Sequence, residues 1–418
     1  MATASLVLDN VRLFPRTADA PTTRLTITDG IITSTDRSPI PDGAIVEDCR
    51  GALVMPSLGD VHAHLDSNRL DLPFRPHTSD GSLIGLITND VENWRTAEKS
   101  ITWRTNNALD RILASGATTI RSHAQVDPQT QLDRFHAVLD ARERHSNAVD
   151  MQIVAFPQLG IVRAPGALDL MRAALAEGAD LIGGIDPCGL EKDPVTHLNA
   201  VFSLAEDTGK GIDIHLHERG SLGAFTLGLI AERTHALGME GKVTVSHCFA
   251  LASQESNRER DELISLLADA DIAVTTIAPA GGVLPVHALR EAGVRVGLGE
   301  DGMRDYWSPY GTADVLDRTW QLAFTQGARE DADVELMVKI ASLGSRSILS
   351  GCDYAASDTG LEVGQPGSVV VIDAETVTSA VMDRVPRQLV VHRGRVVARD
   401  NNPLNSGAAQ IDDLAEDR

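Results

Sequence analysis

Residues 52–66 read Ala-Leu-Val-Met-Pro-Ser-Leu-Gly-Asp-Val-His-Ala-His-Leu-Asp, an apolar run that passes directly into histidines and carboxylates. Residues two apart on a strand point to the same side, so His62 and His64 can both face one metal ion. The chemistry of a (β/α)8 barrel lies where its strands end and its loops begin. This stretch therefore favours a barrel with a metal site at its mouth.

Seven further apolar, β-branched runs follow, and helical patterns separate them. Strands that alternate with helices predict parallel pairing with right-handed crossovers. Eight such units favour an α/β fold of the (β/α)8, or TIM-barrel, type over an open doubly wound sheet. The predicted barrel strands are Ala52–Leu58, Ala117–His123, Met151–Gln158, Ala179–Ile185, Gly211–His217, Lys242–Cys248, Asp271–Ala278 and Gly293–Gly299.

Both ends of the chain are rich in short β-type segments and turns, unlike the middle. This pattern predicts one small β-sandwich domain built from residues 1–56 plus 357–402. Its N-terminal part is expected to form a small antiparallel sheet. It would pack beside a metal-dependent barrel of residues 57–356. The polar, acidic residues 403–418 are expected to form a mobile tail.

The composition limits the partners. The chain has 418 residues with 37 basic and 59 acidic side chains, a net charge of −22, which disfavours binding to nucleic acid and to anionic membranes. No apolar run reaches the roughly 18 residues of a membrane span, and the first ten residues lack a signal-peptide pattern. The cysteines show no C-x-x-C spacing, which predicts reduced thiols in a cytoplasmic protein; they are Cys49, Cys188, Cys248 and Cys352.

More polar side chains follow the later strands. His215 and His217 share one face of the fifth predicted strand, so spacing alone leaves the choice of ligand open. The sixth strand ends in His247 and the eighth in Asp301, and Glu218, a carboxylate that can move protons, follows the fifth. Histidine and carboxylate ligands suit Zn, Fe(II) or Mn, and such an ion makes a bound water nucleophilic at neutral pH.

A glycine pattern near the eighth strand is a competing signal. Residues 297–302 match G-x-G-x-x-G, the motif of dinucleotide-binding folds. In those folds a helix opens at once, whereas Tyr306-Trp-Ser-Pro309 follows here. The sequence therefore disfavours a dinucleotide site.

The chain resembles the amidohydrolase superfamily, and within it the cytosine deaminase-like group, over nearly its whole length. The motifs that carry this resemblance are His62-Ala-His-Leu-Asp66, Arg121-Ser-His123, Val154-Ala-Phe-Pro-Gln158, His215-Leu-His-Glu218, Ser246-His247, and Asp301 followed by Trp307-Ser-Pro-Tyr-Gly311. The chain is also similar to the N-isopropylammelide amidohydrolases, through Gly183-Gly-Ile-Asp-Pro187 and Arg304-Asp-Tyr-Trp307.

The resemblance implies one divalent metal ion, Zn or Fe(II). Its four ligands would be His62, His64, His215 and Asp301. The fourth predicted strand has no Lys that could bridge two metals, which agrees with a single ion and disfavours hydrolysis of cyclic amides.

The resemblance also implies roles in catalysis and substrate binding. Glu218 would shuttle a proton to the ring nitrogen, His247 would orient the attacking hydroxide, and Asp301 would accept the proton of the water. Gln158 would hydrogen-bond the edge of a pyrimidine, since an amide both donates and accepts. Trp307 would form an aromatic wall of the pocket.

One departure from the cytosine deaminases concerns the substrate. Those enzymes usually carry His-Asp-Asp at the eighth strand, where this chain has Glu300-Asp-Gly302. The absent second Asp predicts one fewer polar contact to the ring and more space around it. The identity of the heterocyclic substrate is therefore not determined by these motifs.

The predicted function is a metal-dependent aminohydrolase that deaminates a cytosine-like heterocycle by attack of metal-bound hydroxide and releases ammonia. The alternatives are cleavage of an N-alkylamino-triazine or a creatinine-type ring, and a non-catalytic ligand-binding barrel. The partner expected is a small heterocyclic substrate. Members of this family also occur as homo-oligomers, although the sequence shows no interface signal.

Overall fold

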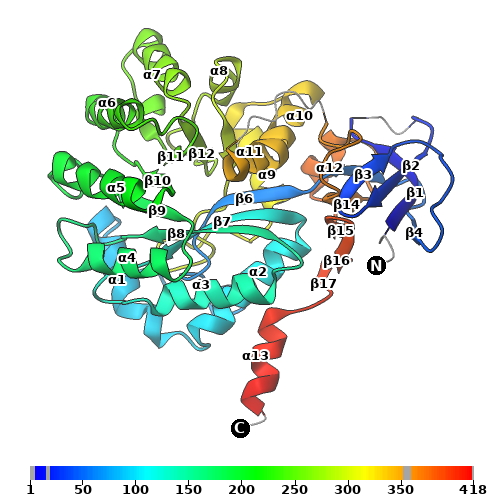
Figure 1. The fold of residues 1–418 in the computed structure, drawn as a ribbon, viewed down its shortest axis with the longest axis horizontal. Helices are drawn as coiled ribbons and strands as arrows, with labels where there is room; N and C mark the ends of the chain where they lie inside the picture. The colour runs from blue at the N-terminus through cyan, green and yellow to red at the C-terminus, as the bar shows by residue number, and fades with distance from the viewer. Residues whose placement is uncertain (1–4, 16–18, 352–358, 417–418) are drawn as a thin grey trace.

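The computed structural model describes residues 5–15, 19–351 and 359–416. Its centre is a sheet of eight parallel strands in chain order, with helices on the outside, which confirms the predicted (β/α)8 barrel (Figure 1). Each strand pairs with the next along the chain, as crossover connections require. The strands are β6 (Leu58–Ala63), β7 (Ala117–Gln125), β8 (Asp150–Phe156), β9 (Leu181–Ile185), β10 (Gly211–His215), β11 (Val243–Ser246), β12 (Ala273–Thr276) and β13 (Val296–Leu298).

The ends of β6 and β13 meet and nearly close the barrel. The backbone N–H of Asp301 donates to the carbonyl of His62 at 2.7 Å, and the N–H of His64 donates to the carbonyl of Asp301 at 3.3 Å. A parallel bridge also joins Ala63 to Asp301. Closure of the barrel therefore brings Asp301 beside the two histidines of the first strand.

Helices cover the outside of the barrel because each presents an apolar stripe to the strands. Helix α2, for example, buries Ala108, Leu109 and Ile112 and begins at a Ser100 cap, whose side chain accepts from the N–H of Trp103. The helices along the barrel are α1 (Leu83–Asn93), α2 (Ile101–Ala114), α3 (Asp133–Arg144), α4 (Ala167–Ala176), α5 (Pro194–Thr208), α6 (Gly220–Ala236), α7 (Asn257–Asp269), α8 (Val286–Glu291), α9 (Val315–Gln326), α10 (Asp331–Lys339) and α11 (Ser345–Ser350).

A separate nine-stranded sheet is built from both ends of the chain. Strand β5 of the N-terminal part pairs antiparallel with β14 of the C-terminal part, which joins the two ends. The sheet is mixed, because β4 and β5 both run parallel to β1, so the expected antiparallel sheet is only partly realised. Its elements are β1 (Ser5–Leu13), β2 (Thr23–Thr28), β3 (Ile31–Ser34), β4 (Ile45–Asp48), β5 (Leu53–Pro56), β14 (Val369–Ile372), α12 (Val377–Asp383), β15 (Arg387–His392), β16 (Arg395–Arg399) and β17 (Asn402–Pro403).

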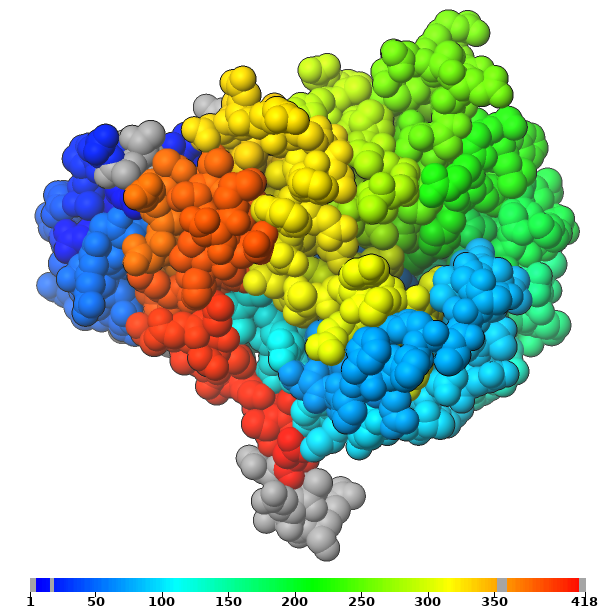
Figure 2. Space-filling view, turned by 180° about the vertical axis from the view of Figure 1, so that it is seen from behind, coloured from blue at the N-terminus to red at the C-terminus, as the bar shows by residue number. Residues whose placement is uncertain are grey.

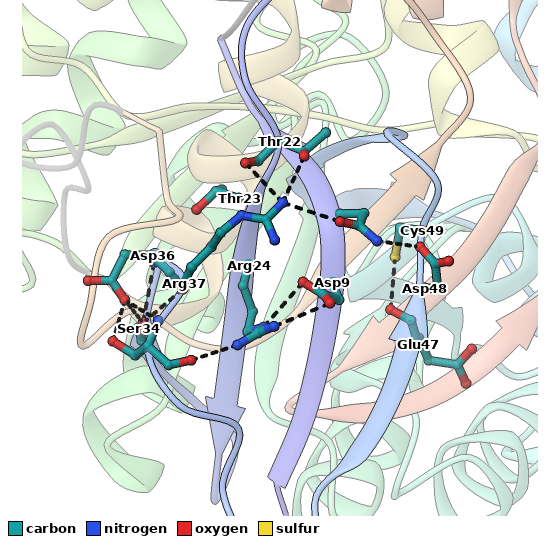
Figure 3. Close-up of polar contacts among 12 residues, drawn as sticks. Asp9, Thr22, Thr23, Arg24, Ser34, Asp36, Arg37, Glu47, Asp48 and Cys49 are labelled. Atoms are coloured by element: carbon teal, nitrogen blue, oxygen red, sulfur yellow. Dashed lines mark hydrogen bonds and ion pairs between the residues drawn. The ribbon is translucent and has the colours of Figure 1, made fainter.

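Polar contacts fix the loops of this sheet to its strands (Figure 3). Arg24 on β2 donates to both carboxylate oxygens of Asp9 on β1, each at 3.2 Å, and to the carbonyl of Ser38. Arg37 donates to the side chains of Asn10 and Thr22. These residues lie in the small sheet and not at the barrel mouth, so they stabilise the fold without a place in the chemistry.

The first predicted barrel strand was wrong in position. Leu53–Pro56 forms β5 of the small sheet, and the barrel strand is Leu58–Ala63. Both segments are fully buried, so apolar character could not assign them to different sheets. The domain boundary predicted at residues 56 and 57 falls between β5 and β6, whereas the one at residues 356 and 357 lies outside the described residues.

Most of the residues for which the sequence predicted a mobile acidic tail are helical in the structure. Residues 407–416 form helix α13 (Gly407–Glu416). The carboxylate of Asp110 on α2 caps its first turn by accepting from the N–H groups of Gly407 and Ala408 at 3.0 and 3.1 Å. Asp412 accepts from Lys99 and Trp103 of the same region, so polar contacts between distant segments hold this helix.

Two other expectations concern membranes and thiols. Within the described part of the chain, every helix is too short or too polar to span a bilayer. Cys49, Cys188 and Cys248 are free thiols. Cys352 lies outside the described residues.

Candidate active site

A cavity of about 750 Å³ opens at the carboxyl-terminal ends of the barrel strands. Figure 2 shows the hollow on this face, with the light-blue segment near residues 75–95 and the yellow segment near 300–315 side by side at its edge. Polar groups lie at its floor and apolar side chains at its rim. The floor includes His64, His215, His247 and Asp301, and the rim includes Leu86, Phe249, Ile277, Trp307 and Tyr310.

Four side chains converge at the floor. The Oδ1 atom of Asp301 lies 3.5 Å from Nε2 of His62 and 3.3 Å from Nε2 of His64, and the Nε2 atoms of His64 and His215 are 3.2 Å apart. Ligands bound tetrahedrally at ordinary Zn–N distances stand about 3.3 Å from one another. Nε2 of His62 is fully buried and has no hydrogen-bond partner among the described residues. These four residues therefore fit a divalent metal ion.

The protonation states of His215 and Asp301 agree with metal binding. Burial lowers the pKa of His215 well below its usual value, which keeps the ring neutral. Burial raises the pKa of Asp301, but the adjacent imidazole rings of His62 and His64 outweigh it and hold this pKa well below the usual range. Neutral imidazole and ionised carboxylate are the forms that bind a metal ion.

A buried hydrogen-bond network lies behind His62. The ring Nδ1 of His62 is 2.9 Å from the hydroxyl of Ser246, which donates to Asp213 at 2.6 Å and accepts from Thr275 at 2.8 Å. The guanidinium of Arg121 donates to the other oxygen of Asp213 at 2.8 Å. Because the second ring nitrogen is fixed in this way, Nε2 of His62 is directed toward the cavity floor.

This network predicts the effect of Ser246→Ala. Loss of the hydroxyl frees the ring of His62 and should weaken metal binding about 10–100-fold, as for outer-layer partners of other metal sites. Competition with a chelating dye measures the affinity. Ser342→Ala is the control, because it removes a buried hydroxyl bonded to a helix carbonyl away from the cavity. Equal affinities of S246A and the unaltered protein would contradict the proposed role.

A second histidine group lies deeper in the barrel. The ring of His123 is 4.3 Å from that of His62, centroid to centroid, and its Nε2 is 3.9 Å from Asp213. Burial lowers the pKa of His123 well below its usual value. Arg121 already balances the charge of Asp213. The outer group, where Asp301 faces the cavity, therefore fits a metal ion better than this inner group.

The backbone turns sharply where the strands end. His247 has a φ of 67° and Asp301 a φ of 64°, both in the left-handed region. Asp186 and Ala278, after β9 and β12, also have positive φ. Such conformations cost of order 1–3 kcal/mol each and are concentrated at functional sites. Here they turn the side chains across the barrel mouth.

Most of the predicted site residues line the cavity, with two exceptions. Gln158, His247 and Trp307 line it together with His64, His215 and Asp301, whereas His62 is fully buried directly behind them. Glu218 is buried beside the cavity but is absent from its lining. One of its oxygens accepts from the backbone N–H groups of Cys188 and Gly189, at 2.8 and 2.7 Å, and the other accepts from the hydroxyl of Thr226.

The structure also adds residues that the sequence argument did not single out. Asp186 accepts from the backbone N–H of His217 and pairs with its ring Nδ1, both at 2.7 Å, so His217 is held by a carboxylate on the cavity wall. Phe156 stacks on the ring of His215 with the centroids 4.1 Å apart. Asp186 and Phe156 both stand in segments that carried the resemblance, which was the signal that could have found them.

Comparisons with known proteins agree with this geometry. The model of the amidohydrolase family matches residues 46–398. The N-isopropylammelide isopropyl amidohydrolase of Pseudomonas sp. (strain ADP) is 30% identical over 365 residues, which cover 84% of this chain and 88% of that protein.

Two solved structures are also similar. That of N-isopropylammelide isopropylaminohydrolase from Burkholderia multivorans is 39% identical, with a TM-score of 0.87 over 96% of this chain and all of that one. That of 5-methylcytosine deaminase from Klebsiella pneumoniae, liganded with 5-fluorocytosine, is 25% identical, with a TM-score of 0.79 over 94% of this chain and 97% of that one. The relatives named above are hydrolases and deaminases. This chain belongs to the amidohydrolase family.

Proposed function

We propose that the protein is a metal-dependent aminohydrolase that cleaves an exocyclic C–N bond of a nitrogen heterocycle. The convergence of His62, His64, His215 and Asp301 at the cavity floor is the observation that carries this proposal. A single Zn(II) or Fe(II) ion bound there would lower the pKa of a water molecule and make it nucleophilic near neutral pH. The relatives that act on ammelide and cytosine rings support the choice of a heterocycle.

The side chains divide the proton transfers. Asp301 is positioned to take the first proton of the attacking water, and His247, which lines the same floor, orients that water. Glu218 gives its own proton to the ring nitrogen, takes the hydroxyl proton of the resulting adduct and passes that proton to the leaving amine. The proton held by Asp301 then restores Glu218 for the next cycle. Its three hydrogen-bond donors hold it beside the cavity, so it must turn toward the substrate to act.

The ring is held between an amide and an aromatic side chain. Gln158 can both donate to and accept from a planar heterocycle, and Trp307 offers a flat apolar surface. The apolar rim formed by Leu86, Phe249 and Ile277 favours a second candidate, in which the leaving group is an alkylamine rather than ammonia.

The test is the amine released by metal-loaded protein. The panel contains cytosine, isocytosine, creatinine and N-isopropylammelide, and the assay separates ammonia from isopropylamine. Turnover of a ring in the panel is expected. Isopropylamine would assign the alkylamino substrate, and ammonia from a pyrimidine would assign the deaminase. Metal-loaded protein that releases no amine from any of these rings would contradict the proposal.

A further inference from the structure

The space beside Gly302 contains a carboxylate from another position. A Cβ atom built on Gly302 would lie 2.1 Å from Oδ2 of Asp305, which is far inside contact distance. The expectation that the glycine leaves extra room next to the metal ligand Asp301 is therefore wrong. Any larger residue at position 302 would have to displace the Asp305 carboxylate, which occupies that room.

Asp305 belongs to the cavity and not only to its loop. It is 4% exposed and lines the cavity together with Asp301, Gly302 and Trp307. Its backbone carbonyl is 3.0 Å from Nε2 of His77, a contact that fixes the loop from outside.

The two carboxylate oxygens of Asp305 have different surroundings. Oδ1 accepts from the backbone N–H groups of Trp307 and Ser308, at 2.8 and 2.9 Å, and so shapes the loop that carries the aromatic wall. No described residue donates a hydrogen bond to Oδ2, which lies next to Gly302. One oxygen is thus used by the protein, and the other is free to meet a ligand.

We propose that Asp305 determines substrate specificity by accepting, through Oδ2, a hydrogen bond from an N–H group on the edge of the heterocycle. This inference rests on the proposed function. It selects rings that present an amide- or amidine-type N–H toward Asp305, and it disfavours rings that are N-alkylated or present only acceptors there.

The electrostatic environment of Asp305 favours a hydrogen-bond donor from the substrate next to its Oδ2 atom. Burial, together with the nearby carboxylates of Asp301 and Asp90, raises the pKa of Asp305 to about 7, against the lowering effect of the N–H groups of Trp307 and Ser308. An ionised side chain without a full set of donors is costly in a buried place. A donor from the substrate lowers that cost, and this makes the contact selective.

The variant Asp305→Asn separates recognition from loop structure. Its Oδ1 keeps both backbone donors, while an NH₂ group replaces Oδ2 and turns the acceptor into a donor. With the ring that the unaltered protein turns over fastest in the panel above, D305N should raise KM about 10–100-fold, because it loses a hydrogen bond to a charged group. Metal content and the midpoint of thermal unfolding should stay unchanged.

A methylated substrate distinguishes recognition of the ring from a purely structural role of Asp305. A structural role would not change the discrimination between a ring and its N-methylated form. The unaltered protein should discriminate against the same ring with its N–H group methylated, and D305N should lose most of that discrimination. Gly302→Ala, which forces the carboxylate out of its place, should show the same loss. Asp127→Asn is the matched control, because Oδ1 of the buried Asp127 also accepts from backbone N–H groups two and three residues on, and Asp127 does not line the cavity.

The outcomes distinguish this inference from the function on which it rests. An active unaltered protein, together with a D305N variant of equal KM and equal discrimination, would overturn the inference alone and leave Asp305 as a loop residue. Absence of amine release from every ring would overturn the proposed function and the inference together.

Discussion

Asp301→Asn should reduce turnover by at least about 10³-fold, because in the proposed mechanism it removes both a charged metal ligand and the acceptor of the water proton. Asn suits this test since Asp301 has a φ of 64°, a left-handed conformation that Asn adopts readily. The backbone contacts of residue 301 with His62 and His64 involve no side-chain atoms and should persist. Steady-state amine release and metal analysis of the purified variant measure the two losses.

A loss of activity in D301N can be assigned to the chemistry only if the variant is folded. Circular dichroism should be unchanged in D301N, and thermal unfolding in the presence of a chelator should match that of the unaltered protein. A D301N variant that keeps a full metal complement and more than a tenth of the activity would show that Asp301 is neither ligand nor proton acceptor.

The second large effect is expected for Glu218→Gln, with a loss of about 10²–10⁴-fold in kcat, since an amide cannot exchange protons as a carboxylate does. The hydrogen bonds permit the replacement. The amide oxygen can accept from the N–H groups of Cys188 and Gly189, while its NH₂ donates to the hydroxyl of Thr226, which can also accept. Metal content should not change.

Glu191→Gln is the matched control for Glu218. Glu191 is also buried and also accepts from backbone N–H groups, those of Ile161 and Arg163 among them, but it does not line the cavity. Its replacement should affect stability more than kcat. Similar kcat values for E218Q and the unaltered protein would remove Glu218 from the mechanism and reduce it to a holder of the loop at Cys188.

The sequence could predict the barrel because its signal repeats. Eight buried strands alternate with amphipathic helices, and each repeat reinforces the others. It failed where two neighbouring segments share one character, as at β5 and β6, which are both buried and belong to different sheets. It also missed helix α13, whose first turn depends on Asp110, about three hundred residues earlier in the chain.

The site was predictable in its residue types but not in its distances. The alternation of a strand shows that His215 and His217 share a face, and it does not show that Asp186 binds the ring of His217. Only the resemblance to the amidohydrolases favoured His215 over His217 as a metal ligand. The approach of Asp305 to Gly302 depends on the path of a loop, which neither periodicity nor motif spacing determines.

The most direct test of a one-metal aminohydrolase is amine release during metal titration. Chelator-treated protein receives Zn(II) in steps, and the rate is followed with a ring from the panel that the loaded protein turns over. The rate should start near zero, rise linearly to one equivalent per chain and then stay level. A full rate without added metal, or a rise that ends only at two equivalents, would contradict the assignment of one ion to His62, His64, His215 and Asp301.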